Sequence, residues 1–331
     1  MKKYDVYGLG NALVDMEFEV DDAFLRKNGI EKGVMTLVDE DHQHRLLCQL
    51  DAFEGARASG GSAANSLIAV GAMGGSAYYS CKVADDELGH FYLHDLQAAR
   101  VDCNLDGKHK DGVTGKCLVM VTPDAERTMH TFLGISAEMS PGELNPQAIE
   151  DAHYCYLEGY LTTSESGKQA NIEARKIAES HGVKTALTFS DPFVVEHFRS
   201  DFIETIGDGV DLLFCNEAEA LHFSQKDSID AAIESLKDCA RRFAVTLGKQ
   251  GALVYDGHSL FEIAATPAKA IDTNGAGDMF AGAFLYGLTH GYDFEAAGKL
   301  ASLAAARIVE KFGPRLSVEQ YRGIVSESLQ A

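Results

Sequence analysis

The run Asp272–Asp278, which reads Asp-Thr-Asn-Gly-Ala-Gly-Asp, constrains the fold of this chain more than any other stretch. The apolar run Met279–Leu285 follows it at once, and the small residues within that run predict a buried helix packed closely against a neighbour. The backbone N–H groups at a helix start are unpaired and carry a partial positive charge. The glycines ahead of this helix leave those groups accessible, so the sequence predicts an anion site there.

A carboxylate, Asp278, closes this turn and has two interpretations. A carboxylate beside an anion site repels a bound phosphate unless it has a task there. One task is to accept the proton of a hydroxyl group while that hydroxyl attacks phosphorus. The alternative is that Asp278 only caps the helix.

The complete heptapeptide closely resembles the C-terminal signature of the ribokinase-like (PfkB) family of sugar and nucleoside kinases. The resemblance implies that Asp278 is the catalytic base and that the backbone of Gly275, Ala276 and Gly277 forms an anion hole. It also implies ATP as the phosphoryl donor, together with Mg²⁺. A requirement for a monovalent cation such as K⁺ stays open.

A second small-residue turn, Ala58–Ser66, precedes another apolar helix that continues through Ala72. It resembles the N-terminal signature of the same family, in which a Gly-Gly pair and a nearby Asn contact the hydroxyl groups of the substrate. The resemblance therefore implies substrate contacts for Gly60, Gly61 and Asn65.

Asp15 matches the family carboxylate that accepts hydrogen bonds from two neighbouring hydroxyl groups. The two oxygens of a carboxylate suit a vicinal diol, because each can accept one O–H. The surrounding run Gly10–Asp15 resembles the Gly-Asn-x-x-x-Asp of adenosine kinases, which adds Asn11 and Leu13 to the candidate substrate-binding residues.

Further residues belong to the candidate substrate site. Asn274 occupies the variable position of the C-terminal signature, as in adenosine kinases. A nucleoside base needs a flat apolar slot, and the candidates to line it are Leu13, Leu37, Phe132, Leu133 and Tyr160. The alternative for these apolar residues is that they belong to the ordinary core.

Two runs rich in Val, Thr and Met, Gly115–Val121 and Arg127–Thr131, flank a five-residue turn and predict a hairpin. With strands near 14–20 and 34–38, the hairpin would form a small separate sheet. In the resembling family such a sheet is a lid over the substrate, so we expect a discontinuous lid from about 14–38 and 112–133.

Arg127, at the start of the second hairpin strand, lies where adenosine kinases carry an arginine directed at phosphate. The alternative is an exposed hairpin charge. By the resemblance, Arg127 joins Asp278 among the candidate catalytic residues.

From Ala152 onward, predicted strands and helices alternate, which is typical of βαβ units and a parallel sheet. The predicted strands are 153–157, 183–189, 211–215 and 243–247, and the predicted helices are 165–181, 196–206, 228–242 and 296–311. With the resemblance, this pattern predicts one α/β unit over residues 1–331. It is a ribokinase-like three-layer α/β/α domain with a mostly parallel sheet, plus the small lid sheet.

Two stretches after predicted strands resemble nucleotide-binding motifs of the family. Asn216 and Glu219 match an N-x-x-E motif that organises Mg²⁺ and phosphates, Glu219 largely through water. Thr246, Gly248 and Gly251 match the loop that lines the ATP groove.

The net charge of −21 argues against binding to nucleic acid or to an anionic membrane surface, because little here would neutralise phosphates. Seven cysteines without a C-x-x-C pair indicate buried thiols in a reducing compartment. No signal peptide or long apolar span is apparent, so we expect a cytoplasmic protein without a membrane partner. Whether it is a monomer or a homodimer stays open.

The motifs together predict an ATP-dependent kinase that phosphorylates the 5′-hydroxyl of a nucleoside, adenosine above all. The first alternative is a sugar kinase of the same family, acting on ribose, fructose or a sugar acid. A distant alternative is an inactive nucleotide-binding regulatory protein, although Asp278 and the signature glycines are retained.

Overall fold

Nine strands form the large sheet of the computed structural model, which describes residues 2–50, 55–105, 111–124 and 126–329. In spatial order they are β14 (Leu260–Ile263), β13 (Ala252–Tyr255), β12 (Phe243–Thr246), β11 (Leu212–Asn216), β10 (Lys184–Thr188), β9 (Ala152–Glu158), β1 (Tyr4–Leu9), β5 (Ala77–Ser80) and β6 (Val101–Cys103). Neighbours from β12 to β6 are parallel, and among these nine strands only β13 runs in the opposite direction, because it pairs antiparallel with both β12 and β14. The predicted mostly parallel sheet is confirmed.

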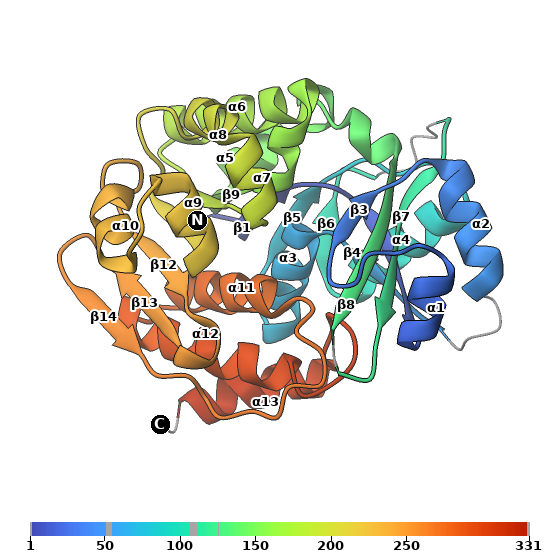
Figure 1. Ribbon diagram of the computed structural model, residues 1–331. Coiled ribbons are helices and arrows are strands. Elements are labelled where there is room, and N and C mark those ends of the chain that lie inside the picture. Colours follow the sequence, from blue (N-terminus) through green and yellow to red (C-terminus); the bar gives the residue numbers. More distant parts are fainter. Residues whose placement is uncertain (1, 51–54, 106–110, 125, 330–331) are drawn as a thin grey trace.

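Helices cover both faces of the large sheet. Successive strand residues point to opposite faces, and both sets of side chains are apolar and buried. Val6 and Phe214 belong to one buried core, while Tyr7 and Cys215 belong to the other. On the Val6 side lie α3 (Ser62–Met73), α4 (Glu87–Ala98), α11 (Ala276–Thr289), α12 (Phe294–Ile308) and α13 (Val318–Ser328). On the Tyr7 side lie α5 (Pro146–Glu150), α6 (Glu165–Ser180), α7 (Pro192–His197), α8 (Arg199–Ile206), α9 (Glu217–Ser224) and α10 (Ile229–Leu236). The result is the predicted three-layer arrangement (Figure 1).

A second sheet follows directly from the carboxyl end of β1. Its described strands, in spatial order, are β3 (Met35–Leu37), β8 (Arg127–Gly134), β7 (Thr114–Val121), β2 (Leu13–Glu19) and β4 (Gly55–Gly60). The antiparallel pair β7–β8 is the predicted hairpin, and Ala125 in its turn lies outside the described residues. Helices α1 (Asp22–Lys27) and α2 (Glu40–Leu50) lie at the outer side of this sheet (Figure 1).

Strand β2 divides its side chains between two environments. Val14, Met16 and Phe18 are buried in the apolar core. Asp15 and Glu17 alternate with them and therefore point to the opposite face of the sheet. The period-two pattern of this strand thus places two carboxylates on the face that lies toward α11.

The structure corrects three predictions of secondary structure. Gly55–Gly60 is a strand, because it pairs with β2, although the sequence predicted a turn from Ala58. The predicted helix 196–206 is two helices, since Asp191 caps a first helix that begins at Pro192. The predicted helix 228–242 ends at Leu236, because the chain must then pair residues 210 and 240 beside β11.

Four short 3₁₀ helices complete the described elements: η1 (Ile135–Glu138), η2 (Pro141–Glu143), η3 (Gly159–Thr163) and η4 (Gly248–Gln250). Within the described ranges, no helix combines the length and the apolar character that crossing a membrane requires.

Candidate active site

Asp278 lies in the first turn of α11, and its side chain reaches the first turn of α3. The cap of α11 is Gly275, with a φ of 71° and no side-chain bond, so the interpretation of Asp278 as the helix cap is wrong. Instead, Ser62 Oγ donates to Asp278 Oδ1 at 2.7 Å, and Asn65 Nδ2 donates to Asp278 Oδ2 at 2.9 Å. The two sequence signatures therefore meet at one carboxylate.

The surroundings of Asp278 change its acidity. Burial raises the pKa of Asp278 above its ordinary value, because the ionised form is poorly solvated there. The hydrogen bonds from Ser62 and Asn65 and the positive charges of Arg127 and Arg315 act in the opposite direction. The result is a carboxylate that is held in place and is more basic than an exposed one, as general-base chemistry requires.

The amino end of α11 leaves backbone donors available to a ligand. Ala276 N donates to Thr273 O, whereas the N–H groups of Gly277 and Asp278 have no partner within the part of the chain that the structure describes. A Cβ built on Gly277 would meet no atom within 4 Å, so the approach to these donors is open. Free N–H groups at a helix start suit an anion, and Asp278 stands beside them.

Arg127 joins the second sheet to the turn before α11. Its Nη1 donates to Asn274 Oδ1 at 2.7 Å, and its Nε lies 3.3 Å from Asp272 Oδ1. Asn274 Nδ2 in turn donates to Glu17 Oε1 at 3.4 Å. Arg127 is therefore paired and only 21% exposed, so the interpretation of a free hairpin charge is wrong.

Asp15 offers a buried carboxylate without a donor of its own. It is 8% exposed, and no hydrogen bond to it arises from any residue that the structure describes. Burial, assisted by the negative charge of Glu17, raises the pKa of Asp15 to about 7. A Cβ on Gly60 would lie 2.2 Å from Asp15 Cγ, so only glycine leaves room for this carboxylate.

The remaining residues of the N-terminal motifs lie side by side where the two sheets join. Leu13 pairs with Gly60 across β2 and β4. Gly61 caps α3 with a φ of 105°, and a Cβ there would lie 2.1 Å from Asn11 O. Ser136 Oγ donates to Asn11 Oδ1 at 3.1 Å and fixes the orientation of that amide. The structure thus brings together the predicted substrate residues of both segments.

A buried carboxylate that the sequence analysis missed ties these two segments together. Glu158 ends β9, and its two oxygens accept the backbone N–H groups of Asn11 at 2.9 Å and Ala63 at 2.8 Å. Burial raises the pKa of Glu158 to about 7. The sequence did contain a signal that could have identified it. Glu158 directly follows the apolar run Ala152–Leu157, and ligand sites of parallel sheets lie at the carboxyl ends of their strands.

Arg315 is a second residue that the sequence analysis missed. It follows Gly313 and Pro314, which only indicated the end of a helix. Its Nε donates to Asn65 Oδ1 at 3.2 Å, so it stands one residue behind Asp278. Nothing local in the sequence distinguishes it from a surface arginine.

The predicted metal residue Glu219 lies in a helix cap. Both of its oxygens accept from Asn216, one from the backbone N at 2.9 Å and one from Nδ2 at 2.8 Å. Burial raises the pKa of Glu219 to about 8. In the described part of the chain, no group of three or more His, Cys, Asp or Glu side chains suits a metal ion. Since each oxygen of Glu219 already accepts a hydrogen bond from Asn216, contact with a cation through water or through the phosphates of a nucleotide suits this side chain.

Tyr160 lies in η3, close enough to Asp278 and Glu219 to feel the charges of both. Burial raises the pKa of Tyr160 well above its ordinary value, and the charges of Asp191, Asp278 and Glu219 act in the same direction. Its hydroxyl is therefore neutral and within electrostatic range of the whole site.

The predicted ATP loop stands apart from these contacts. Thr246 ends β12, and Gly248 and Gly251 have positive φ values of 57° and 97° in the tight turn that follows. Over the described residues, no hydrogen bond joins them to Asp278 or its partners. Like Asn216, these residues lie at the carboxyl ends of the parallel strands, because β12 runs beside β11.

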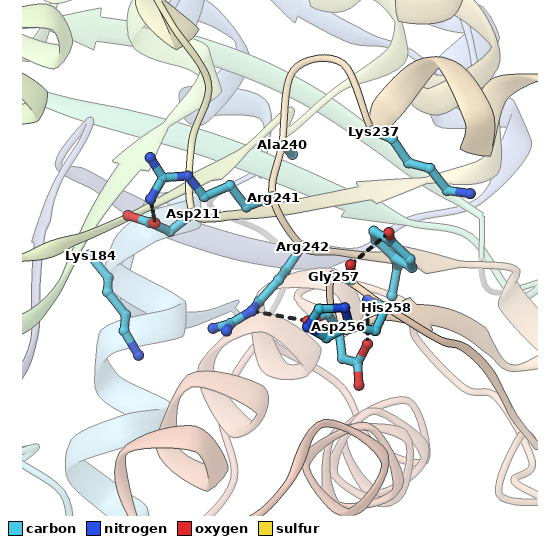
Figure 2. Close-up of a pocket in the computed structure, with 10 residues that line it drawn as sticks. Lys184, Asp211, Lys237, Ala240, Arg241, Arg242, Asp256, Gly257 and His258 are labelled. Atoms are coloured by element: carbon cyan, nitrogen blue, oxygen red, sulfur yellow. Dashed lines mark hydrogen bonds and ion pairs between the residues drawn. The ribbon is translucent and has the colours of Figure 1, made fainter.

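A groove of about 560 Å³ lies at the amino ends of the strands of the large sheet, opposite the carboxyl ends where Asp278 and its partners lie. None of the predicted site residues lines it. Figure 2 shows its lining at the amino ends of β10, β11 and β12, with Arg241 paired to Asp211 at 2.9 Å. Arg242 Nε donates to Asp256 O at 3.1 Å on the other side of the groove. It offers no carboxylate beside a free helix start, so the candidate active site is the cluster around Asp278.

Known proteins resemble this chain over most of its length. The sequence model described as pfkB family carbohydrate kinase matches residues 34–320. An adenosine kinase of Saccharomyces cerevisiae is 27% identical over 334 aligned positions, which cover 94% of this chain and 96% of that protein.

Two solved structures resemble it more closely. An adenosine kinase from Sinorhizobium meliloti is 38% identical with a TM-score of 0.90, covering 99% of this chain and 100% of that chain. A probable sugar kinase from Rhizobium etli is 35% identical with a TM-score of 0.91, covering 98% of this chain and 99% of that chain. Nucleoside and sugar kinases are thus both among the similar proteins.

Proposed function

The chain belongs to the pfkB family of carbohydrate kinases, and on that premise we propose that it transfers a phosphoryl group from ATP to the 5′-hydroxyl of adenosine. The products are AMP and ADP, which makes this a reaction of purine salvage. The observation that carries the proposal is the position of Asp278, held between Ser62 and Asn65 beside the free N–H groups of α11.

In the proposed mechanism, Asp278 accepts the proton of the 5′-hydroxyl as its oxygen attacks the terminal phosphorus of ATP. The oxygen–phosphorus bond to ADP breaks, and the proton stays on an oxygen of the Asp278 carboxyl. The N–H groups of Gly277 and Asp278 would stabilise the charge on the transferring group, because a helix start favours anions. The raised pKa of Asp278 assists, since a stronger base takes the proton more readily.

Asp15 would hold the ribose by accepting one O–H from each of its two vicinal hydroxyl groups. Its freedom from donors within the described chain supports this role, as does the room that Gly60 leaves beside it. Asn11, Gly61 and Asn65 would line the same pocket, and Leu13 and Tyr160 its apolar part. A substrate held in this way presents its 5′-hydroxyl at a fixed distance from the base.

For the nucleotide we propose the carboxyl edge of β11 and β12, with Asn216, Thr246, Gly248 and Gly251 as contacts. Mg²⁺ bound to the phosphates would supply positive charge that the net-acidic chain lacks. Glu219 would contact this cation through water, since each of its oxygens already accepts a hydrogen bond from Asn216.

The second sheet is proposed to act as a lid, extending the predicted segments 14–38 and 112–133 by the strand Gly55–Gly60. Its contact with the signature turn through Arg127 supports closure over the substrate. Closure would exclude water, to which ATP would otherwise lose its phosphoryl group. A smaller radius of gyration in small-angle scattering after addition of adenosine is the expected result, and identical scattering would contradict the lid.

A sugar kinase is the second candidate, favoured by the similarity to the probable sugar kinase of Rhizobium etli. The two substrates share a vicinal diol and a primary hydroxyl group, so Asp15 and Asp278 would serve both. The two substrates differ in the nucleobase, which only adenosine carries and which requires an apolar slot in the protein.

A ligand screen separates the two candidates. A ligand present at 100 times its Kd stabilises the native state by about 2.7 kcal/mol, or about 4 °C in melting temperature for a chain of this length. We expect such a shift with adenosine and not with ribose or fructose, together with ATP-dependent formation of AMP.

Asp278→Asn serves as the control for the chemistry. It should keep the adenosine shift but lose about 10²–10⁴-fold in kcat, because the amide cannot accept the proton. A shift with a sugar alone would establish the second candidate, and near-normal kcat of Asp278→Asn would show that the base assignment is wrong.

A further inference from the structure

Arg315 reaches three elements of the active site from a loop near the C-terminus. Its Nη2 donates to Ser59 Oγ of β4 at 3.1 Å, and its Nε donates to Asn65 Oδ1 of α3 at 3.2 Å. Its Nη1 lies 3.9 Å from Asp95 Oδ2 of α4, and the side chain is only 18% exposed. A buried guanidinium with this many partners has one position, not a range of them.

The loop that carries Arg315 is itself held against the signature turn. Gly313 N donates to Asp272 Oδ2 at 3.0 Å. A Cβ on Gly275 would lie 3.0 Å from Pro314 Cβ, so the two loops are in close contact. Arg315 is therefore positioned relative to the start of α11 by backbone contacts and not by its own side chain alone.

Asn65 stands between this arginine and the proposed base. Its Oδ1 accepts from Arg315, while its Nδ2 donates to Asp278 Oδ2 at 2.9 Å. A guanidinium has only donors and an ionised carboxylate only acceptors, so no other orientation of the amide satisfies both neighbours. Arg315 and Asp278 thus both select the orientation in which the NH₂ end of the Asn65 amide faces the proposed base.

We propose that Arg315 is a positioning residue for phosphoryl transfer, which acts by holding the Asn65 amide with its NH₂ group toward Asp278. The proposal rests on the proposed function, in which Asp278 is the general base. Without the guanidinium, only Asp278 itself orients the Asn65 amide, so the amide is held less firmly and with it one of the two donors that aim the carboxylate of Asp278 at the substrate hydroxyl. This role extends the site to a residue from the C-terminal loop.

The charges around Asp278 give this role a measurable signature. Arg127 of β8 and Arg315 lower the pKa of Asp278, against the raising effect of burial. Acidic groups that feel the charge of Asp278 are Asp15 of β2, Glu158 at the end of β9, Glu219 of α9, Tyr156 of β9 and Tyr160 of η3. Removing the charge of Arg315 takes away one of the two cations that lower the pKa of Asp278, so this pKa should rise. The pH below which the base is protonated should then rise.

The test compares Arg315→Gln, which removes the charge, with Arg315→Lys, which keeps it. Arg307→Gln is the matched control, because Arg307 lies on α12 and pairs with Glu327 of α13 at 2.9 Å, away from the site. For Arg315→Gln we expect a loss in kcat on the order of 10–100-fold, as for a misplaced catalytic group. The acidic limb of its kcat/KM profile should move upward by up to about one pH unit. Arg315→Lys should keep the wild-type limb, and Arg307→Gln should keep both the limb and kcat.

A double-mutant cycle with Asn65→Ala tests whether Arg315 acts through Asn65. If it does, Arg315→Gln should lower kcat much less in the Asn65→Ala background than in the wild type. Fully additive losses would overturn the proposal, as would a wild-type kcat and pH profile for Arg315→Gln, whatever its melting temperature. A wild-type enzyme that forms no AMP from adenosine and ATP would overturn the proposed function itself, whereas a normal Arg315→Gln enzyme beside an inactive Asp278→Asn enzyme would overturn this inference alone.

Discussion

Gly282→Ala probes how closely the two helices that carry the active site must pack. Gly282 lies in the middle of α11 and faces α3. A Cβ at this position would lie 2.4 Å from Ser66 O and 2.9 Å from Ala69 Cβ. Since ordinary contacts begin at 3.4 Å, the helices must separate by about 1 Å to accept the methyl group.

That separation would act directly on Asp278, the proposed base. Ser62 and Asn65, on α3, hold the carboxylate of Asp278 on α11, and Ser66 Oγ donates to Asp278 O at 3.0 Å. A misplacement of about 1 Å between a base and its substrate can cost on the order of 10²-fold in rate. We therefore expect kcat to fall by about that factor while the Kd for ATP changes little.

The effect on stability should be small by comparison. Overpacking costs about 1–3 kcal/mol, and replacing a glycine in a helix interior by alanine returns about 1 kcal/mol. The net loss of at most about 2 kcal/mol lowers the melting temperature by about 3 °C for a chain of this length. The variant is thus folded at 25 °C, and its kcat reports geometry and not unfolding.

Gly323→Ala is the matched control for this experiment. Gly323 also lies within a helix, α13, but a Cβ there would meet no atom within 4 Å. It should therefore gain the same helix propensity and keep wild-type kcat. Steady-state kinetics and thermal melts of both variants make the comparison. Wild-type kcat for Gly282→Ala would refute the inference that the α3–α11 contact sets the geometry of the base.

Three further predictions concern the carboxylates and the second sheet. Asp15→Ala should raise the KM for adenosine and abolish the preference for adenosine over 2′-deoxyadenosine, and a wild-type enzyme without that preference would contradict the diol contact. Arg127→Ala should lower kcat more than it weakens adenosine binding, because Arg127 joins β8 to the signature turn, and an unchanged kcat would exclude that role. Burial raises the pKa of Asp15, Glu17 and Glu158 to about 7 and of Glu219 to about 8, so the native state binds more protons than the unfolded state between about pH 5 and pH 7. The melting temperature without ligands should therefore rise as the pH is lowered from 8 to 6, and a fall would show that these groups are not buried as described.

Local features of the chain were predictable from the sequence because they depend on neighbouring residues. The free donors at the start of α11 follow from a Gly-Ala-Gly turn ahead of an apolar helix. The alternation of strand and helix after Ala152 follows from the period of the apolar residues, and so does the placing of Asp15 and Glu17 on one face of β2. The strand Gly55–Gly60 of the second sheet was not predicted, because its small residues carry no strand signal and only pairing with β2 makes it a strand.

The tertiary structure alone decided which distant residues meet. Asp278 and Ser62 are 216 positions apart, and Arg315 and Asn65 are 250 positions apart. Their contacts arise because α3 and α11 pack on the same face of the large sheet, an arrangement that depends on the spatial order of the strands and not on any local pattern. Glu158 reaches Asn11 only because β9 lies beside β1. The sequence therefore determined the chemistry of the helix start and its carboxylate, whereas packing of the sheets and helices determined the partners that hold that carboxylate in place.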